Sequence, residues 1–273
     1  MKKLTIDSPA KVNLTLDVLP KKDKVNPSER GREDALGYGE DFHKIKTIYH
    51  KIDLHDEIEI QFSDKFEIIG EFDFPMEENL IFKAWKLIGD FVDKNDFHPV
   101  KVKIIKNIPM GGGLGGGSSN FANFVKGYFK LFDLKEVPQA LINKSGEIGK
   151  DIPFFFSSAR CAIGTNFGEV ISDVPFDSDK FKDKTIYLYK PSFKNSTPEM
   201  FRKLKKSNTD FTNKFLIESE LKNCGNTFDQ FLEEKKYKYL VLNSKVIISG
   251  SGSCFFSFKP LKVKDCEIIE TNL

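Results

Sequence analysis

Arginine and net charge are both scarce in this sequence. Of the 42 basic side chains only four are arginine, and 40 acidic residues leave a formal net charge of +2. Proteins that recognise nucleic acid concentrate positive charge on one surface and depend on the bidentate arginine side chain. We therefore expect no nucleic-acid partner.

Cysteine and long apolar runs are also scarce. The four cysteines include no C-x-x-C pair, which argues against a zinc cluster and against a disulfide framework and favours a reducing compartment. No stretch approaches the ~18 apolar residues of a membrane span. The N-terminus, MKKLTIDSPAKVNL, lacks the apolar core of a signal peptide. These features predict a cytoplasmic protein with no membrane partner.

What is present suffices for a large core, since 40% of the 273 residues are hydrophobic. Alternating apolar residues predict a strand, or a bent pair of strands broken at Pro9, over 3–18 and a strand over 45–62. A helix is predicted by the helical spacing of Leu80, Ile81, Ala84, Leu87, Ile88 and Phe91. A second helix is expected after the glycines at 111–117, and another over 137–148. Strands and helices without regular alternation predict an α+β fold.

The pattern restarts near residue 180, so we expect two domains, 1–165 and 166–273. Residues 20–41 are charged, contain two prolines and show no apolar period, which predicts a surface loop. The segment that starts with DIPFFF at 151–156 and continues to Val170 is expected to be buried and partly extended.

The segment between Pro109 and Asn120 carries the strongest chemical signal. Six of the seven residues 111–117 are glycine, so no Cβ keeps a ligand from the backbone, and a helix begins just beyond them. Inward-facing N–H groups and a helix N-terminus together bind anions such as phosphate. A flexible linker is the alternative, but linkers seldom join a strand to a helix that begins with serine. No lysine follows as in a Walker A loop, and the dinucleotide-binding context is absent.

Two further segments accompany this loop, S-P-A-K-V-N at 8–13 and G-S-G-S-C-F-F at 250–256. The three together resemble the motifs of the GHMP small-molecule kinases. The resemblance implies two domains, ribosomal-protein-S5-domain-2-like at the N-terminus and ferredoxin-like at the C-terminus. The active site is then expected in the cleft between them, with ATP as cosubstrate.

Within that family, E-N-L-I at 78–81, G-K-D-I-P-F-F at 149–155 and the stretch after His43 resemble the branch that acts on a cytidyl substrate. The implied activity is phosphorylation of the 2-hydroxyl of 4-diphosphocytidyl-2-C-methyl-D-erythritol, in the non-mevalonate isoprenoid pathway, by a monomer or homodimer. Three departures accompany it. The family usually has far fewer residues between the counterparts of Lys11 and His43, so 20–41 is expected to be an insertion. Asp41-Phe42 replaces the usual Gly-Tyr, and Lys150 stands where the family commonly has alanine.

The resemblance also implies roles for individual residues. Asp151 is the expected general base, and Lys11 beside it is expected to offset charge that develops on the substrate oxygen. The expected substrate contacts are Asn13, Phe42, His43 and Phe201, with the two phenylalanines stacking on cytosine. The expected ATP contacts are Asn79, Lys106, Pro109, Met110, Gly111, Gly112, Gly113, Leu114, Gly115, Gly116, Gly117, Ser118 and Ser119.

Mg²⁺ is expected because it neutralises the triphosphate, although no carboxylate cluster identifies protein ligands for it. Ser118 or Ser119 is the candidate contact. Three alternatives stay open: another GHMP kinase of the homoserine or mevalonate type, an inactive binding protein on the same fold, and a dinucleotide oxidoreductase. Retained Lys11 and Asp151 argue against the second of these.

Overall fold

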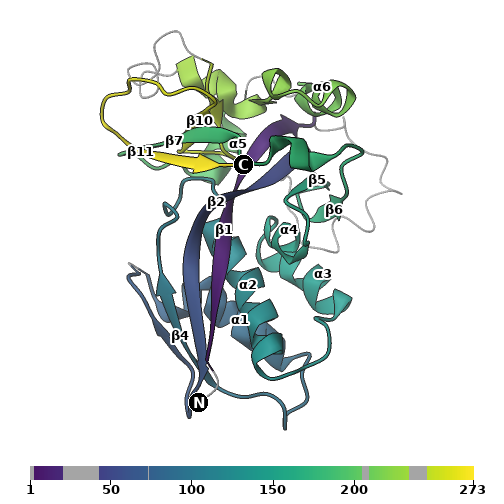
Figure 1. Ribbon diagram of the computed structural model, residues 1–273, viewed down its shortest axis with the longest axis vertical. Helices are drawn as coiled ribbons and strands as arrows, with labels where there is room; N and C mark the ends of the chain where they lie inside the picture. Colours follow the sequence, from purple (N-terminus) through teal and green to yellow (C-terminus); the bar gives the residue numbers. More distant parts are fainter. Residues whose placement is uncertain (1–2, 21–42, 73, 205–208, 234–244) are drawn as a thin grey trace.

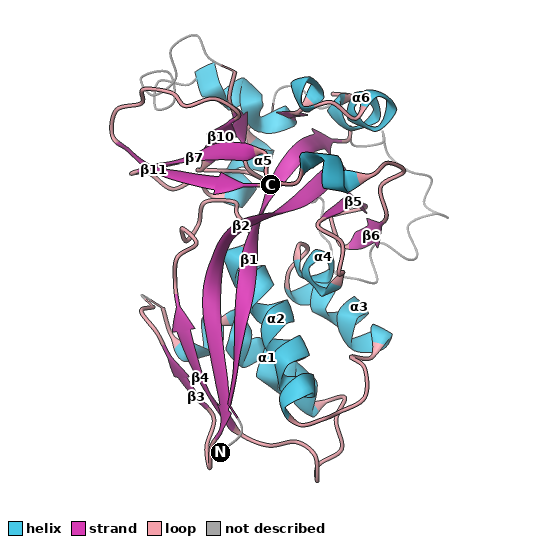
Figure 2. Ribbon diagram, viewed as in Figure 1, coloured by secondary structure: helices cyan, strands magenta, loops and turns pink. Residues whose placement is uncertain are grey.

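Two β-sheets and the helices packed beside them form the structure, a computed structural model that describes residues 3–20, 43–72, 74–204, 209–233 and 245–273 (Figure 1). The first sheet has seven strands and the second has four. Helices and strands are mixed in both parts (Figure 2), so the α+β prediction is confirmed.

Two long antiparallel strands, β1 and β2, run through the first sheet. Strand β4 pairs with the second half of β2 and β5 with its first half, while β8 adds to β1 in parallel. The strands are β1 (Lys3–Val18), β2 (Ile45–Phe62), β3 (Glu67–Ile69), β4 (Val100–Ile105), β5 (Cys161–Thr165), β6 (Val170–Ser172) and β8 (Gly225–Asn226).

Four helices cover one side of this sheet (Figure 1): α1 (Leu80–Gly89), α2 (Gly116–Leu131), α3 (Gln139–Ile148) and α4 (Ile152–Phe156). Helix α2 lies directly on β1 and β2. Gly127 permits this, because a Cβ there would stand 2.1 Å from Ile6 Cδ1. Helix α1 buries Ile81, Ala84, Leu87 and Ile88, four of the six positions that the sequence spacing predicts.

The second sheet follows the order β11-β7-β10-β9 and lies beyond one end of the first (Figure 1). Its strands are β7 (Thr185–Pro191), β9 (Ile247–Ile248), β10 (Phe255–Ser257) and β11 (Cys266–Asn272). Helices α5 (Thr197–Arg202) and α6 (Phe211–Glu218) belong to the same half of the chain. Short 3-10 turns occupy Met76–Glu78, Ser178–Phe181, Leu221–Asn223 and Thr227–Glu233.

Strand β1 is irregular where its polar residues lie. The register with β2 shifts between Pro9 and Lys11 and again between Asn13 and Thr15. Such bulges redirect the side chains beside them. Lys11 and Asn13, two residues apart, therefore share one face, and Asn13 lies opposite Tyr49.

The backbone of the glycine-rich loop is in direct contact with the turn between β9 and β10. Cys254 N donates to Gly112 O at 3.2 Å, and Ser249 Oγ donates to Gly113 O at 3.0 Å. Gly113 has φ +77, and a Cβ there would stand 2.0 Å from Ser249 O. The two sheets are thus joined where two turns pack without a side chain between them.

Two details differ from, or extend beyond, the sequence expectations. Residues 151–170 are partly extended, as predicted, because β5 lies within them, but residues 152–156 form a short helix, with Pro153 in the first turn, where its missing N–H is not needed. The first sheet also contains β6 and β8, which come after residue 165, so the boundary at 165 stays a prediction. Within the described ranges, no helix has the length and apolar character needed to cross a membrane.

We expect Gly113→Ala to destabilise the protein far more than the matched Gly111→Ala. Both glycines have positive φ, which costs an L-residue about 1–2 kcal/mol. At Gly111 the added Cβ would meet only the Lys194 side chain at 3.6 Å, an ordinary contact. At Gly113 it would overlap backbone, for which overpacking adds about 1–3 kcal/mol.

Urea unfolding of the two variants measures this difference. Equal free energies of unfolding would contradict the view that the two turns are locked together.

Candidate active site

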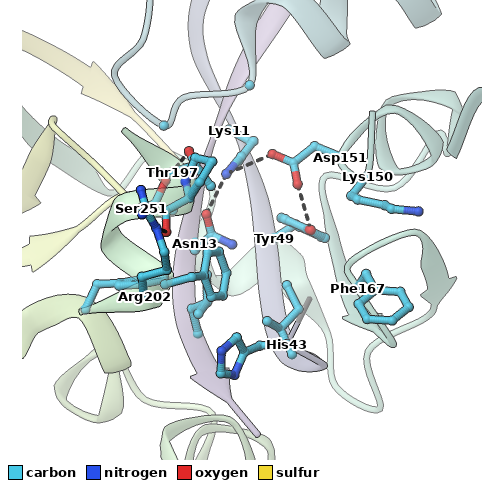
Figure 3. Close-up of a pocket in the computed structure, with 18 residues that line it drawn as sticks. Lys11, Asn13, His43, Tyr49, Lys150, Asp151, Phe167, Thr197, Arg202 and Ser251 are labelled. Carbon is cyan, nitrogen blue, oxygen red and sulfur yellow. Dashed lines mark hydrogen bonds and ion pairs between the residues drawn. The ribbon is translucent and has the colours of Figure 1, made fainter. Parts of the chain in front are cut away.

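A cavity of about 520 Å³ lies between the two halves of the chain (Figure 3). Strands β1 and β2 contribute one side of it, and α5 with the turn after β9 contributes another. The residues that line this cavity include Lys11, Asn13, His43, Tyr49, Asp151 and Phe201.

Lys11 is a buried cation at the inner end of this cavity. Only 2% of its side chain is exposed, and a buried charge is tolerated only when it is paired and hydrogen-bonded. Its ammonium donates to Asn13 Oδ1 at 2.6 Å and lies 3.3 Å from Asp151 Oδ2 (Figure 3). Asn13 is oriented in turn because its amide donates to Thr47 Oγ1 at 2.7 Å. The structure therefore brings the predicted catalytic pair together.

Asp151 stands immediately before α4, with 31% of its side chain exposed. Its second oxygen, Oδ1, accepts a hydrogen bond of 2.9 Å from Tyr49 (Figure 3). Burial, and next the charge of Asp151, raises the pKa of Tyr49 well above its usual value, so this hydroxyl stays protonated and donates. Lys11 and Tyr49 thus hold the two carboxylate oxygens separately.

Tyr49 was not among the residues expected from the sequence. The alternation of 45–62 was the available signal, because it predicts one side-chain face for β2, and residue 49 lies opposite Asn13 on β1. Lys150, next to Asp151, also lines the cavity. It forms an ion pair with Glu169 at 3.8 Å, and its side chain points away from Lys11 (Figure 3).

The other end of the cavity is aromatic. The rings of His43 and Phe201 stack with centroids 5.6 Å apart and an interplanar angle of 21°. Phe228 meets the Phe201 ring edge-on at 5.0 Å. Phe42 lies outside the described residues. Two of the three aromatic contacts expected from the sequence are therefore neighbours in one cavity.

A second cavity, of about 350 Å³, lies on the other side of the glycine-rich loop. Residues 109–118 line it, together with Asn79 and Lys106. Both cavities include Gly113 and Gly115, so they adjoin through the loop. Lys11 N donates to Leu114 O at 2.9 Å, which fixes the loop against β1 beside the Lys11–Asp151 pair.

The expected ATP contacts of the second cavity have structural partners as well. Asn79 caps α1 by accepting from Ile81 N at 2.9 Å. Lys106 pairs with the fully buried Asp56, whose Oδ1 also accepts from the backbone N–H of Ile108 at 2.8 Å. Asp56, which the sequence analysis missed, therefore shapes the start of the loop.

The two serines after the glycines lie differently. Ser118 lines the second cavity. Ser119 does not line it; it is fully buried, and its hydroxyl accepts from Ser8 Oγ at 2.8 Å. Only Ser118 of this pair is therefore open to a ligand in the loop.

The arrangement is suited to group transfer between two small molecules. One cavity is lined by residues 109–118, which include six glycines without Cβ atoms, and glycine-rich segments before a helix are typical of phosphate sites. The neighbouring cavity ends in a carboxylate and an ammonium. The carboxylate can accept a proton, and the ammonium can offset negative charge that develops on an attacking oxygen.

Comparison with known proteins gives the same picture. The family model described as "GHMP kinases N terminal domain" matches residues 79–158. A 4-diphosphocytidyl-2-C-methyl-D-erythritol kinase from Prochlorococcus marinus (strain MIT 9515) is 31% identical over 99% of this chain and 90% of its own length.

Two solved structures share the fold. A crystal structure of 4-(cytidine 5'-diphospho)-2C-methyl-D-erythritol kinase superposes with a TM-score of 0.70 at 24% identity, over 93% of this chain and 89% of the other. The mevalonate kinase of Methanococcus jannaschii gives 0.60 at 16% identity, over 99% and 98%. Because the 31% identity to such a relative extends over nearly the full length of both chains, this chain belongs to the 4-diphosphocytidyl-2-C-methyl-D-erythritol kinase family, within the GHMP kinases.

Proposed function

We propose that this kinase transfers the γ-phosphoryl group of ATP to the 2-hydroxyl of 4-diphosphocytidyl-2-C-methyl-D-erythritol. The observation that carries the proposal is the Lys11–Asp151 pair, which ends one cavity at the point where the glycine-rich loop separates it from the other. A nucleotide bound in one cavity and an acceptor bound in the other would then meet at the Lys11–Asp151 pair. The name of the 31% identical relative supplies the acceptor.

We assign ATP to the second cavity. Gly111, Gly113 and Gly115 all have positive φ, which turns successive backbone groups in ways that side chains would hinder. Helix α2 begins at Gly116 and runs for 16 residues, so the positive end of its dipole faces the loop. Phosphates placed there would be held by backbone donors, and Lys106 and Asn79 also line this cavity.

The cytidyl end of the acceptor fits the aromatic end of the first cavity. A base that stacks on Phe201 would take over the contact that His43 makes with that ring. His43 offers a ring nitrogen to the edge of the base, and Phe42 stays a predicted second stacking residue. The erythritol end would then point toward Asn13, Lys11 and Asp151.

Chemistry at the hydroxyl needs a proton acceptor and compensation of charge. In our proposal the hydroxyl proton passes to Asp151, while the Lys11 ammonium offsets the negative charge that develops on the attacking oxygen. Asn13 keeps Lys11 in place through the 2.6 Å hydrogen bond. Phosphoryl transfer of this type depends mainly on positioning and electrostatics, which rigid strands provide.

Magnesium is proposed to enter with the nucleotide. Across the part of the chain that the structure describes, no group of three or more His, Cys, Asp or Glu side chains could hold a metal ion. Phosphate oxygens and water suit Mg²⁺, and the ion neutralises phosphate charge when bound. Ser118, which lines the nucleotide cavity, is the candidate protein contact.

Both substrates are small and water-soluble. We therefore propose a cytoplasmic reaction that involves neither nucleic acid nor membrane. We propose separately that the enzyme is a monomer or homodimer.

A coupled assay of ATP consumption tests the proposal directly. We expect turnover with the cytidyl substrate and none above background with homoserine or mevalonate. Turnover with either of the latter alone would assign the chain to another activity of the GHMP kinases. No turnover with any of the three would favour an inactive binding protein.

Asp151→Asn should lower kcat by roughly 10²-fold or more, the scale for losing a positioned base. The fold and ATP affinity should be unchanged, since Asn preserves the shape of the side chain. Asp90→Asn, at an exposed position after α1, is the matched control. Near-normal turnover of Asp151→Asn would remove Asp151 as the base.

Lys11→Met should lower kcat on a similar scale, and combining it with Asp151→Asn should cost much less than the product of the two effects. Residues that act as a unit are non-additive in this way. Rate constants from single-turnover experiments on the three variants measure it. Independent, multiplicative losses would mean that the two side chains contribute separately.

Phe201→Ala should raise KM for the cytidyl substrate about 5- to 150-fold, because stacking on one aromatic ring is worth ~1–3 kcal/mol. KM for ATP should not change, since Phe201 lines only the first cavity. Phe176→Ala is the control, because that half-buried ring packs against Phe181 and Phe215 and lines neither cavity. A loss confined to kcat would assign Phe201 to support of the catalytic pair.

A further inference from the structure

We propose that Tyr49 is a positioning residue for Asp151: its hydroxyl holds Oδ1 of the carboxylate, so that Oδ2, beside Lys11, is the atom that receives the substrate proton. The inference rests on the proposed function, because it assigns one oxygen of the proposed base to the chemistry and the other to orientation.

The geometry separates the two oxygens. Tyr49 donates to Oδ1 at 2.9 Å, and Lys11 Nζ lies 3.3 Å from Oδ2 (Figure 3). A carboxylate held by one oxygen alone can rotate about its Cβ–Cγ bond, because that torsion has a broad preference. With both oxygens engaged by groups on β1 and β2, rotation is restricted, and one oxygen is presented to the cavity.

Tyr49 is itself rigidly placed. It is fully buried, and its ring stacks on Phe154 of α4 at 4.9 Å. The same ring lies 5.5 Å from Lys11 Nζ, close enough for a cation–π contact. One side chain on β2 therefore touches Lys11, Asp151 and the helix that Asp151 precedes.

Two glycines leave space for this tyrosine. A Cβ on Gly164 would stand 2.4 Å from Tyr49 Cε2, and a Cβ on Gly168 would stand 2.6 Å from the hydroxyl oxygen. Gly168 O also lies 3.4 Å from that oxygen as a second acceptor. The hydroxyl thus occupies a site shaped for it between Asp151 and the β5–β6 turn.

The charges around the pair set the direction of the hydrogen bond. Asp151 lies next to Lys11, which belongs to β1. Glu169, in the β5–β6 turn, is the second carboxylate whose charge acts on Tyr49, and Glu169 is itself paired with Lys150. Burial, and next the charges of the two carboxylates, raise the pKa of Tyr49 and disfavour a tyrosinate, so its hydroxyl stays the donor.

Tyr49→Phe tests the role, because it keeps the ring and removes only the hydroxyl. We expect kcat to fall roughly 10-fold, the scale of one hydrogen bond to a charged group, with both KM values unchanged. The acid limb of the kcat–pH profile should move to higher pH, because the carboxylate has lost a donor and keeps its proton more readily.

Tyr128→Phe is the matched control. Tyr128 is also fully buried, and its hydroxyl donates to His98 O at 2.8 Å, away from both cavities. Its loss lowers stability without moving the acid limb. A Tyr49→Phe enzyme with an unmoved acid limb, whatever its kcat, would overturn the proposal, since purely structural damage has that result.

Replacing Tyr49 by 3-fluorotyrosine changes the donor in the opposite sense. Fluorine makes the phenol a stronger hydrogen-bond donor, so the acid limb should move to lower pH. Shifts in the same direction for both variants would contradict the assigned hydrogen bond.

A third measurement needs no substrate. In protein labelled with carboxyl-¹³C aspartate, the Asp151 signal, assigned by its loss in Asp151→Asn, should titrate at higher pH in Tyr49→Phe than in the unmodified chain. An identical titration would overturn the inference even if the cytidyl substrate is phosphorylated. The expected shift in a chain without turnover would contradict only the proposed function.

Discussion

The close approach of two turns is the constraint on which the rest of the structure depends. Gly113 and Ser249 are so near that no Cβ fits between them, and hydrogen bonds from Ser249 Oγ and Cys254 N join the turns. Asn226, in the first sheet, adds to this by donating to Ile248 O and Gly250 O at 2.7 and 2.8 Å. Because the two backbones are in direct contact here, the glycine-rich loop is fixed in place. Its residues Gly113 and Gly115 line both cavities.

A buried lysine lies beside the glycine-rich loop and is tolerated because its charge is paired. A charge removed from water must find a paired and hydrogen-bonded setting, and Lys11 finds Asp151 and Asn13. Each of these is fixed by another group, Tyr49 for the carboxylate and Thr47 for the amide. The polar cluster is therefore satisfied from within the protein, which keeps it ordered before any substrate enters.

Much of the fold was predictable because the long elements have clear periods. The alternation over 3–18 and 45–62 became β1 and β2, and the helical spacing after residue 79 became α1. Within 151–170 the pattern did not separate the five helical residues of α4, little more than one turn, from the extended chain of β5. A short apolar run of that length has the same pattern in a helix and in a buried strand.

The sequence by itself determined the chemistry that is available: the positions of the glycines, one lysine and one aspartate in recognisable settings, and an α+β arrangement of elements. Only the tertiary structure decided which groups meet. Residues 11, 49 and 151 are far apart along the chain, and their contacts depend on strand register, on the bulges of β1 and on the seating of α4. Tyr49 and Asp56 carry no local motif, so their roles arise from packing across strands, which composition and spacing do not encode.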